Sequence, residues 1–115
     1  MKVQIKRVYL PADKNDGKRV LVDRLWPRGL TKDAAKVDVW LKELGPSTEL
    51  RKWFGHDPEK WGEFQKRFRS ELNKNKELVA ELTQLAESGK VTLVYGAHDE
   101  EHNNAVVIRD FLAAA

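Results

Sequence analysis

The strongest constraint on the fold is the five-residue run VTLVY at positions 91–95 of this 115-residue chain. Four of its five residues are apolar, and Gly96 follows it directly. A short run of this kind is typical of a central strand that is buried on both faces. Two further runs rich in β-branched and apolar residues, at 3–9 and 19–25, are predicted to be its neighbours in one sheet.

Helical signals lie between the second and third runs. Thr31 is a predicted N-cap of a short helix that extends through Lys36, and residues 37–41 alternate like a further strand. Ser47 is a natural N-cap for a helix over 48–54. These signals predict short elements that connect the sheet to the helical middle of the chain.

The middle of the chain carries the clearest helical periodicity. Asp57 and Pro58 form an N-cap followed by a proline at the first helical position. Apolar residues then recur at spacings of three and four, which predicts one buried helix face: Trp61, Phe64, Phe68 and Leu72. A similar stripe at 78–86 indicates a second helix, which Gly89 is expected to end in the left-handed conformation.

With a last helix predicted from Asn103 or Asn104, strands and helices alternate along the chain. This alternation predicts an α/β fold: a small three-layer domain with a short, largely parallel sheet flanked by helices. Residues 1–115 are expected to form one domain, because their number leaves no room for two self-sufficient cores.

Composition excludes several classes of protein. The chain has no cysteine, which excludes disulfides, zinc–thiolate sites, iron–sulfur clusters and thiol nucleophiles, and which suits the cytoplasm. Its apolar runs are too short for a bilayer, and its first residues are patterned like a strand rather than a signal peptide, so no membrane partner is expected. Phosphate-loop, dinucleotide and serine-elbow motifs are absent, and no cofactor is predicted.

Charge is spread unevenly around a net value of +3. Residues 1–32 hold nine Lys and Arg against three Asp, whereas residues 77–115 hold two against seven Asp and Glu. One interpretation is that the two ends lie close together and neutralise each other. The other is a basic patch for nucleic acid phosphates, formed by six cations of the first third: Lys2, Lys6, Arg7, Lys18, Arg19 and Arg28.

Two loops that follow predicted strands carry the candidate site residues. The loop at 22–29 supplies four candidate ligand-binding residues: Asp23, Arg24, Trp26 and Arg28. Arginine suits bidentate contacts to phosphate or carboxylate, and tryptophan offers a stacking face. The loop at 95–104 supplies Tyr95 and Asn103 as ligand contacts and Asp99 with His102 as candidate catalytic groups.

Because ligands bind beyond the carboxyl ends of the strands in an open α/β sheet, the two loops are expected to face one cleft. Arg24 or Arg28 should then lie within reach of Asp99. Asp23 is expected to be partly buried and held by an arginine or by backbone N–H groups. The ordinary roles compete with these interpretations: a loop-holding Asp23, a core tryptophan, and helix capping by Asp99 or Asn103.

Histidine is the remaining source of chemistry. His56 joins two predicted helices and is either a ligand contact or a plain helix junction. His98 and His102 stand four apart, as in zinc proteases, but aspartate rather than glutamate follows the first histidine, and the segment is a predicted loop. No metal site is therefore predicted.

Four segments, in this order, resemble one known family. They are VDRLWPRG at 22–29, WLKEL at 40–44 with PSTELRKWF at 46–54, HDPEKWGEF at 56–64, and VTLVY at 91–95 followed by Asp99 and Asn103. The chain resembles the YeaO-like branch of the domain of unknown function 488 family over essentially its whole length. In other branches a cysteine precedes the histidine at the position of His102-Asn103, so the resemblance implies the same two loops but no thiol chemistry here.

The sequence thus predicts a domain that binds a small anionic ligand, nucleotide-like or phosphorylated, with hydrolase or transferase activity as an option. Arg24 and Arg28 would bind the anion, Trp26 or Tyr95 would stack, and Asp99 with His102 would move a proton. The alternative is a non-catalytic module that binds nucleic acid or another protein.

Overall fold

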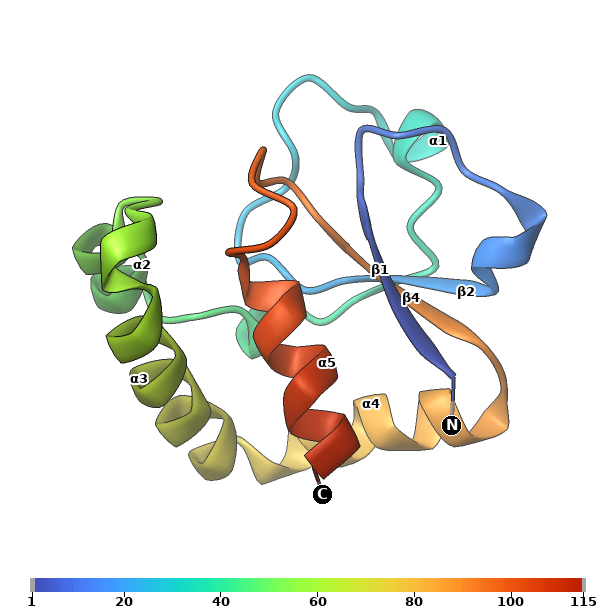
Figure 1. Cartoon of the computed structure of the whole chain (residues 1–115). Coiled ribbons are helices and arrows are strands. Elements are labelled where there is room, and N and C mark those ends of the chain that lie inside the picture. The colour runs from blue at the N-terminus through green and yellow to red at the C-terminus, as the bar shows by residue number, and fades with distance from the viewer. Residues whose placement is uncertain (1, 115) are drawn as a thin grey trace.

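A computed structural model describes residues 2–114. Its four strands are parallel and lie in the order β1-β4-β2-β3, as Figure 1 shows for the first three of them. They are β1 (Val3–Arg7), β2 (Lys18–Leu21), β3 (Val39–Trp40) and β4 (Val91–Tyr95). Every residue of β4 is buried, and β1 and β2 flank it. The predicted central strand and its two neighbours are therefore confirmed.

Five α-helices complete the fold: α1 (Lys32–Ala35), α2 (Thr48–Phe54), α3 (Trp61–Lys74), α4 (Lys76–Ser88) and α5 (Asn104–Ala114). Three short 3-10 helices lie in the connections of the described chain: η1 (Lys14–Asp16) between β1 and β2, η2 (Lys42–Leu44) between β3 and α2, and η3 (Pro58–Lys60) between α2 and α3. Thr31 and Ser47 cap α1 and α2 as predicted, since their hydroxyl oxygens accept hydrogen bonds from Ala34 N–H and Leu50 N–H. No helix in this described part of the chain is long and apolar enough to cross a membrane.

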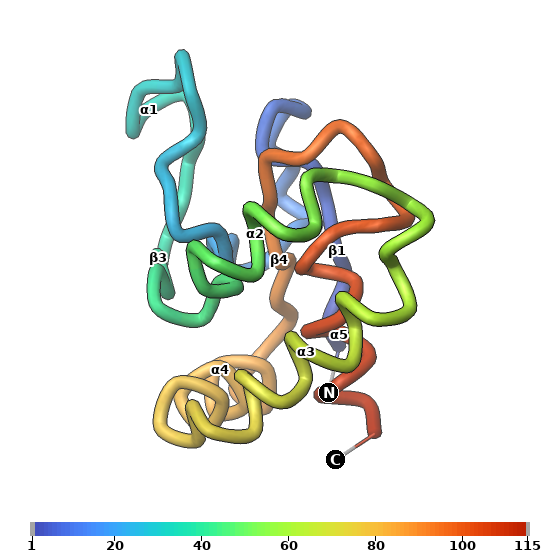
Figure 2. The backbone as a smooth tube through the Cα atoms, turned by 90° about the vertical axis from the view of Figure 1, so that its left-hand side faces the viewer, coloured from blue at the N-terminus to red at the C-terminus, as the bar shows by residue number. Residues whose placement is uncertain are grey.

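The main core lies between one face of the sheet and helices α2 to α5. Strand residues at alternating positions face it, because side chains of a strand point to opposite faces in turn: Val20, Val22, Val91, Leu93 and Tyr95. The α3 stripe faces them with Phe64, Phe68 and Leu72 buried and Trp61 partly buried, as predicted. α5 runs along this face, and in Figure 2 α1 lies on the other side of β4 from it.

The second face of the sheet is covered by short connections rather than long helices. A small apolar cluster of Val8, Leu21, Ala35 and Val94 packs there with Trp26 and Leu30. The connection from β1 to β2 (residues 8–17) is shorter than the roughly dozen residues that a crossover helix usually needs, and the connection from β2 to β3 (residues 22–38) contains only the short helix α1.

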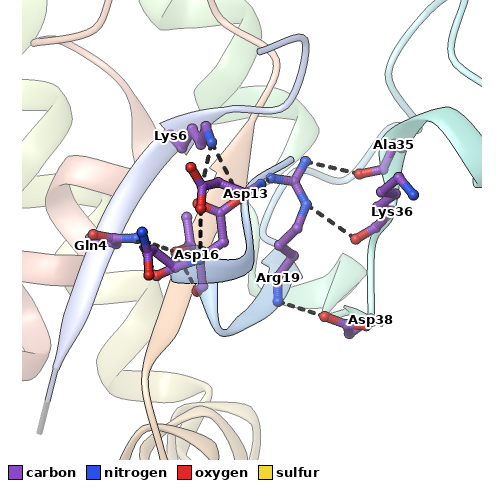
Figure 3. A network of polar contacts seen from close by, with 10 residues as sticks. Gln4, Lys6, Asp13, Asp16, Arg19, Ala35, Lys36 and Asp38 are labelled. Atoms are coloured by element: carbon purple, nitrogen blue, oxygen red, sulfur yellow. Dashed lines mark hydrogen bonds and ion pairs between the residues drawn. The ribbon is translucent and has the colours of Figure 1, made fainter. Parts of the chain in front are cut away.

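A largely buried ion network also lies on the second face (Figure 3). Asp16 accepts hydrogen bonds from Arg19 Nη1 at 2.7 Å and from Lys6 Nζ at 3.2 Å, and Asp16 and Arg19 are each only 3% exposed. Thr92 Oγ1 donates to the Asp16 carbonyl at 2.6 Å and accepts from Gln4 Nε2 at 2.8 Å. The network joins three strands and η1 through one aspartate.

Arg19 also fastens the connection that carries α1. Its Nε donates to the Lys36 carbonyl at 3.1 Å and its Nη2 to the Ala35 carbonyl at 2.9 Å, while its backbone N–H donates to Asp38 Oδ2 (Figure 3). With these contacts and the Asp16 ion pair, each of the three side-chain nitrogens of Arg19 has an acceptor within the protein.

The structure corrects four details. Gly89 has φ 170°, an extended conformation, so it does not end α4 as a left-handed residue. The second strand stops at Leu21, and the predicted strand at 37–41 shortens to two residues. Strands β1 and β4 place the two chain ends side by side, but among residues 2–114 no ion pair joins the basic first third to the acidic last third. Lys6 and Arg19 pair instead with Asp16.

Candidate functional site

A pocket of about 650 Å³ lies beyond the carboxyl ends of β2 and β4. The loop after β2 and the loop after β4 both line it, so the prediction that they face a single cleft is confirmed. Its wall consists of the following residues: Asp23, Arg24, Leu25, Pro46, Arg51, Lys52, Phe54, His56, Phe64, Gly96, Ala97, His98, Asp99, His102, Asn103 and Asn104. All three histidines of the chain are in this wall.

Three of the predicted ligand-binding residues are not part of this wall in the described structure: Trp26, Arg28 and Tyr95. Trp26 packs edge-on against Trp40 and donates from Nε1 to the Leu30 carbonyl at 2.7 Å. Arg28 is exposed, and its carbonyl accepts from Tyr9 Oη. Tyr95 points into the main core because it follows Val91 and Leu93 at alternate positions of β4, and burial raises the pKa of its phenol.

Asp23 is the carboxylate at the base of the pocket. Its Oδ2 accepts from Gly96 N–H at 2.8 Å and its Oδ1 from Asn104 Nδ2 at 3.0 Å. No Lys or Arg nitrogen of the described chain lies within 4.0 Å of it. Burial raises its pKa, and the bonds from Asn104 and Gly96 only partly oppose that effect. The sequence predicted that either an arginine or backbone N–H groups would hold the Asp23 carboxylate. The structure shows a backbone N–H group, that of Gly96, in this role.

Gly96 allows this approach between the two loops. A Cβ at this position would lie 3.2 Å from Asp23 Oδ2, closer than ordinary van der Waals contact. The glycine therefore lets its own N–H reach the carboxylate.

Asp99 and His102 form a local pair. Asp99 Oδ1 accepts from the N–H groups of Glu101 and His102, and its Oδ2 lies 2.9 Å from His102 Nδ1. The Glu101 bond and then the His102 contact lower the pKa of Asp99. The expected contact with Arg24 or Arg28 is absent among the described residues, because these nearby partners satisfy the carboxylate and Arg24 binds elsewhere.

Arg24 fastens the neighbouring loop. Its Nε donates to the Gly45 carbonyl at 3.1 Å and its Nη1 to Glu43 Oε2 at 3.0 Å. Asn103 is also structural, since its Oδ1 accepts from Val106 N–H in the first turn of α5 and its Nδ2 donates to the Asp99 carbonyl. Arg24 and Asn103 therefore both line the pocket and stabilise the loops that form its wall.

His56 lies at the rim in an unusual backbone conformation. Its φ is 57°, one of two positive values at non-glycine residues in the described chain, and it follows Gly55 at φ 53°. Its side chain is exposed, and its ring centroid lies 6.3 Å from that of Phe54. A left-handed backbone is uncommon outside glycine, although histidine adopts it more readily than most residues.

Arg51, like Lys52 and Asn104, is a polar pocket residue that was not among the predicted site residues. Arg51 projects from α2. Among residues 2–114, its buried Nε has no hydrogen-bond acceptor, and its side chain makes one hydrogen bond, a long one of 3.4 Å from Nη2 to Thr48 Oγ1. The one available signal was its position inside the family-like segment 46–54. In the described chain, no three His, Asp or Glu side chains come together as a metal site.

A family model matches the chain over residues 2–115. The chain belongs to the DUF488-N3i family. That family is described as the "Inactive DUF488-N3 subclade". The predicted resemblance to the YeaO-like branch is confirmed by the relatives of this DUF488-N3i chain.

Uncharacterized protein YeaO of Escherichia coli (strain K12) is 42% identical over 112 residues, which is 97% of this chain and 97% of the relative. Uncharacterized protein Rv3073c of Mycobacterium tuberculosis (strain H37Rv) is 41% identical over 111 residues, which is 96% of this chain and 93% of the relative. No solved structure matches the DUF488-N3i chain significantly.

Proposed function

We propose that the pocket binds a small anionic ligand, nucleotide-like or phosphorylated, without transforming it. The observation that carries this proposal is Arg51, a guanidinium in the pocket wall with a buried Nε that has no acceptor. An unsatisfied buried donor costs about 1–3 kcal/mol. If the guanidinium rotates toward the pocket, a phosphate or carboxylate there would offset this cost. Arginine binds such groups through two N–H donors.

The charge of the wall supports an anion. Among the described residues, Arg24, Arg51 and Lys52 are the cations of the wall, against the carboxyl groups of Asp23 and Asp99; because Arg24 is paired with Glu43 at 3.0 Å, Arg51 and Lys52 are the two left for a ligand. The first turn of α5 adds partial positive charge at Asn104, as helix N-termini do. Apolar side chains complete the wall and suit a ring or base: Leu25, Pro46, Phe54 and Phe64.

The description of the family as inactive favours binding over hydrolase or transferase activity. In this proposal Asp99 does not take part in a reaction. It orients His102, whose ring also packs edge-on against Trp61 at 5.2 Å between centroids. With Nδ1 directed to Asp99, the other ring nitrogen of His102 is the one left for a ligand.

The nucleic-acid alternative is less well supported. Two of its six cations, Lys6 and Arg19, pair with the buried Asp16, and Arg7 donates to the Ala97 carbonyl. Cations engaged in this way are not free to contact phosphates. The cysteine-free composition favours action in the cytoplasm.

Binding measurements on Arg51→Met test the proposal, because methionine retains much of the apolar stem and removes the charge. We expect AMP, ribose 5-phosphate or inorganic phosphate to bind the wild type in calorimetry and to bind the variant at least tenfold more weakly. The matched control is Arg69→Met, which changes an exposed arginine of α3 outside the pocket. Equal affinity in wild type and Arg51→Met, or no binding by any of the three compounds, would contradict the proposal.

A further inference from the structure

We infer that Asp23 selects ligands that carry two neighbouring hydroxyl groups, so that the ligand class is a sugar phosphate ester such as a nucleoside monophosphate. This inference rests on the proposed function, because it assigns a second contact in the same pocket. Arg51 would hold the phosphate and Asp23 the diol.

The hydrogen bonds of Asp23 leave acceptor capacity for a ligand. An ionised carboxylate has about four acceptor positions, and the protein fills one on each oxygen: Gly96 N–H binds Oδ2 and Asn104 Nδ2 binds Oδ1. Since Asp23 lines the pocket, the unfilled positions are available there. A pair of neighbouring O–H groups supplies one donor to each oxygen.

The electrostatic setting of Asp23 is unusual for a carboxylate that only holds a loop. The side chain is partly shielded from solvent, yet no Lys or Arg nitrogen of the described chain lies within 4.0 Å. Asp16 on the opposite face of the sheet shows the ordinary solution, with Arg19 and Lys6 both in direct contact. The fold thus leaves the Asp23 carboxylate without a Lys or Arg in direct contact among the described residues, and open to donors from the pocket.

The position of Asp23 also fits a sugar. It follows β2 at the carboxyl edge of a parallel sheet, which is where nucleotide-binding α/β folds place a carboxylate against ribose hydroxyls. Arg51 reaches the same pocket from α2, and the pair interacts electrostatically. Phe54 and Leu25 offer apolar surface for a base, and the volume of about 650 Å³ is within the range of small-molecule sites.

A pair of nucleotides that differ only in the diol tests the inference. We expect AMP to bind the wild type at least tenfold more tightly than 2′,3′-dideoxy-AMP, because a site that bonds hydroxyls discriminates against ligands without them. In Asp23→Asn the two affinities should agree within about twofold. The control Asp33→Asn changes an exposed aspartate of α1 outside the pocket and should keep the wild-type ratio.

The other outcomes of this experiment separate a failure of the inference from a failure of the proposed function. Equal binding of the two nucleotides by the wild type, or an unchanged ratio in Asp23→Asn, would overturn the role of Asp23. If neither nucleotide binds but inorganic phosphate binds in an Arg51-dependent way, this inference fails and the proposed function stands. If no phosphate compound binds, both fail. If Asp23→Asn does not fold, equal binding of the two nucleotides by the wild type would still overturn the inference.

Discussion

At the scale of single residues, three aspartates show how the surrounding donors set each pKa. Burial raises the pKa of Asp16, but the bonds from Asp13 N–H, Arg19 and Lys6 outweigh burial and lower it overall. Burial raises the pKa of Asp23, where two uncharged donors cannot compensate. The pKa of Asp99 is lowered by the Glu101 N–H and by His102. The sequence shows three similar loop or turn aspartates, and only the fold distinguishes them.

Asp16→Asn should lower the free energy of unfolding at pH 7 by about 3 kcal/mol, because Arg19 would lose the charge that compensates it in a buried site. The folded-state pKa of Asp16 lies below its unfolded value. Its stabilising contribution is therefore present above about pH 4 and is lost as pH falls further.

Urea unfolding from pH 7 down to pH 3 measures this effect. The gap between wild type and Asp16→Asn should narrow below about pH 4, because the Asp16 carboxyl of the unfolded wild type takes up a proton there while the folded one stays ionised to lower pH. A gap that stays constant over the whole range would show that the charge of Asp16 does not stabilise the fold.

At the scale of elements, the sequence predicted correctly those features that depend on neighbouring residues, such as helix caps and an apolar helix face. The caps at Thr31 and Ser47 and the stripe of α3 were readable because capping and periodicity act within a few residues. The prediction for Gly89 was wrong because its extended φ depends on how the chain enters β4. The sequence also did not predict that the second strand ends at Leu21. This end depends on tertiary structure, because the chain leaves the sheet there toward Asp23 and the pocket.

The α3 stripe makes a graded prediction about stability. Phe68 is 1% exposed, whereas Trp61 is only partly buried. Phe68→Ala should therefore lower the free energy of unfolding by about 3–5 kcal/mol, and Trp61→Ala by clearly less. Urea unfolding of both variants checks the order. An equal or larger loss for Trp61→Ala would mean that the ring contacts of Trp61 with Phe54, Phe64 and His102 contribute more to the packing of α3 than the buried Phe68 does.

At the scale of the whole molecule, the location of the pocket was predictable and its chemistry was not. Parallel strands bring their carboxyl ends to one edge, so the loops after β2 and β4 had to meet. Arg51 could not be foreseen, because its place depends on how α2 packs over that edge. Trp26 was misplaced in the prediction because its packing against Trp40 on the second face involves a distant element.

A nitrogen-15 NMR titration of the wild type with AMP tests the central claim, that the carboxyl-edge pocket binds a small anion through Arg51. We predict saturable shifts, with one dissociation constant, for the Arg51 Nε–H and for the backbone N–H of Gly96, and none for the Nε–H of the exposed Arg69. Absence of shifts at Arg51 and Gly96, or shifts that spread over exposed arginines such as Arg28 and Arg69, would contradict this claim.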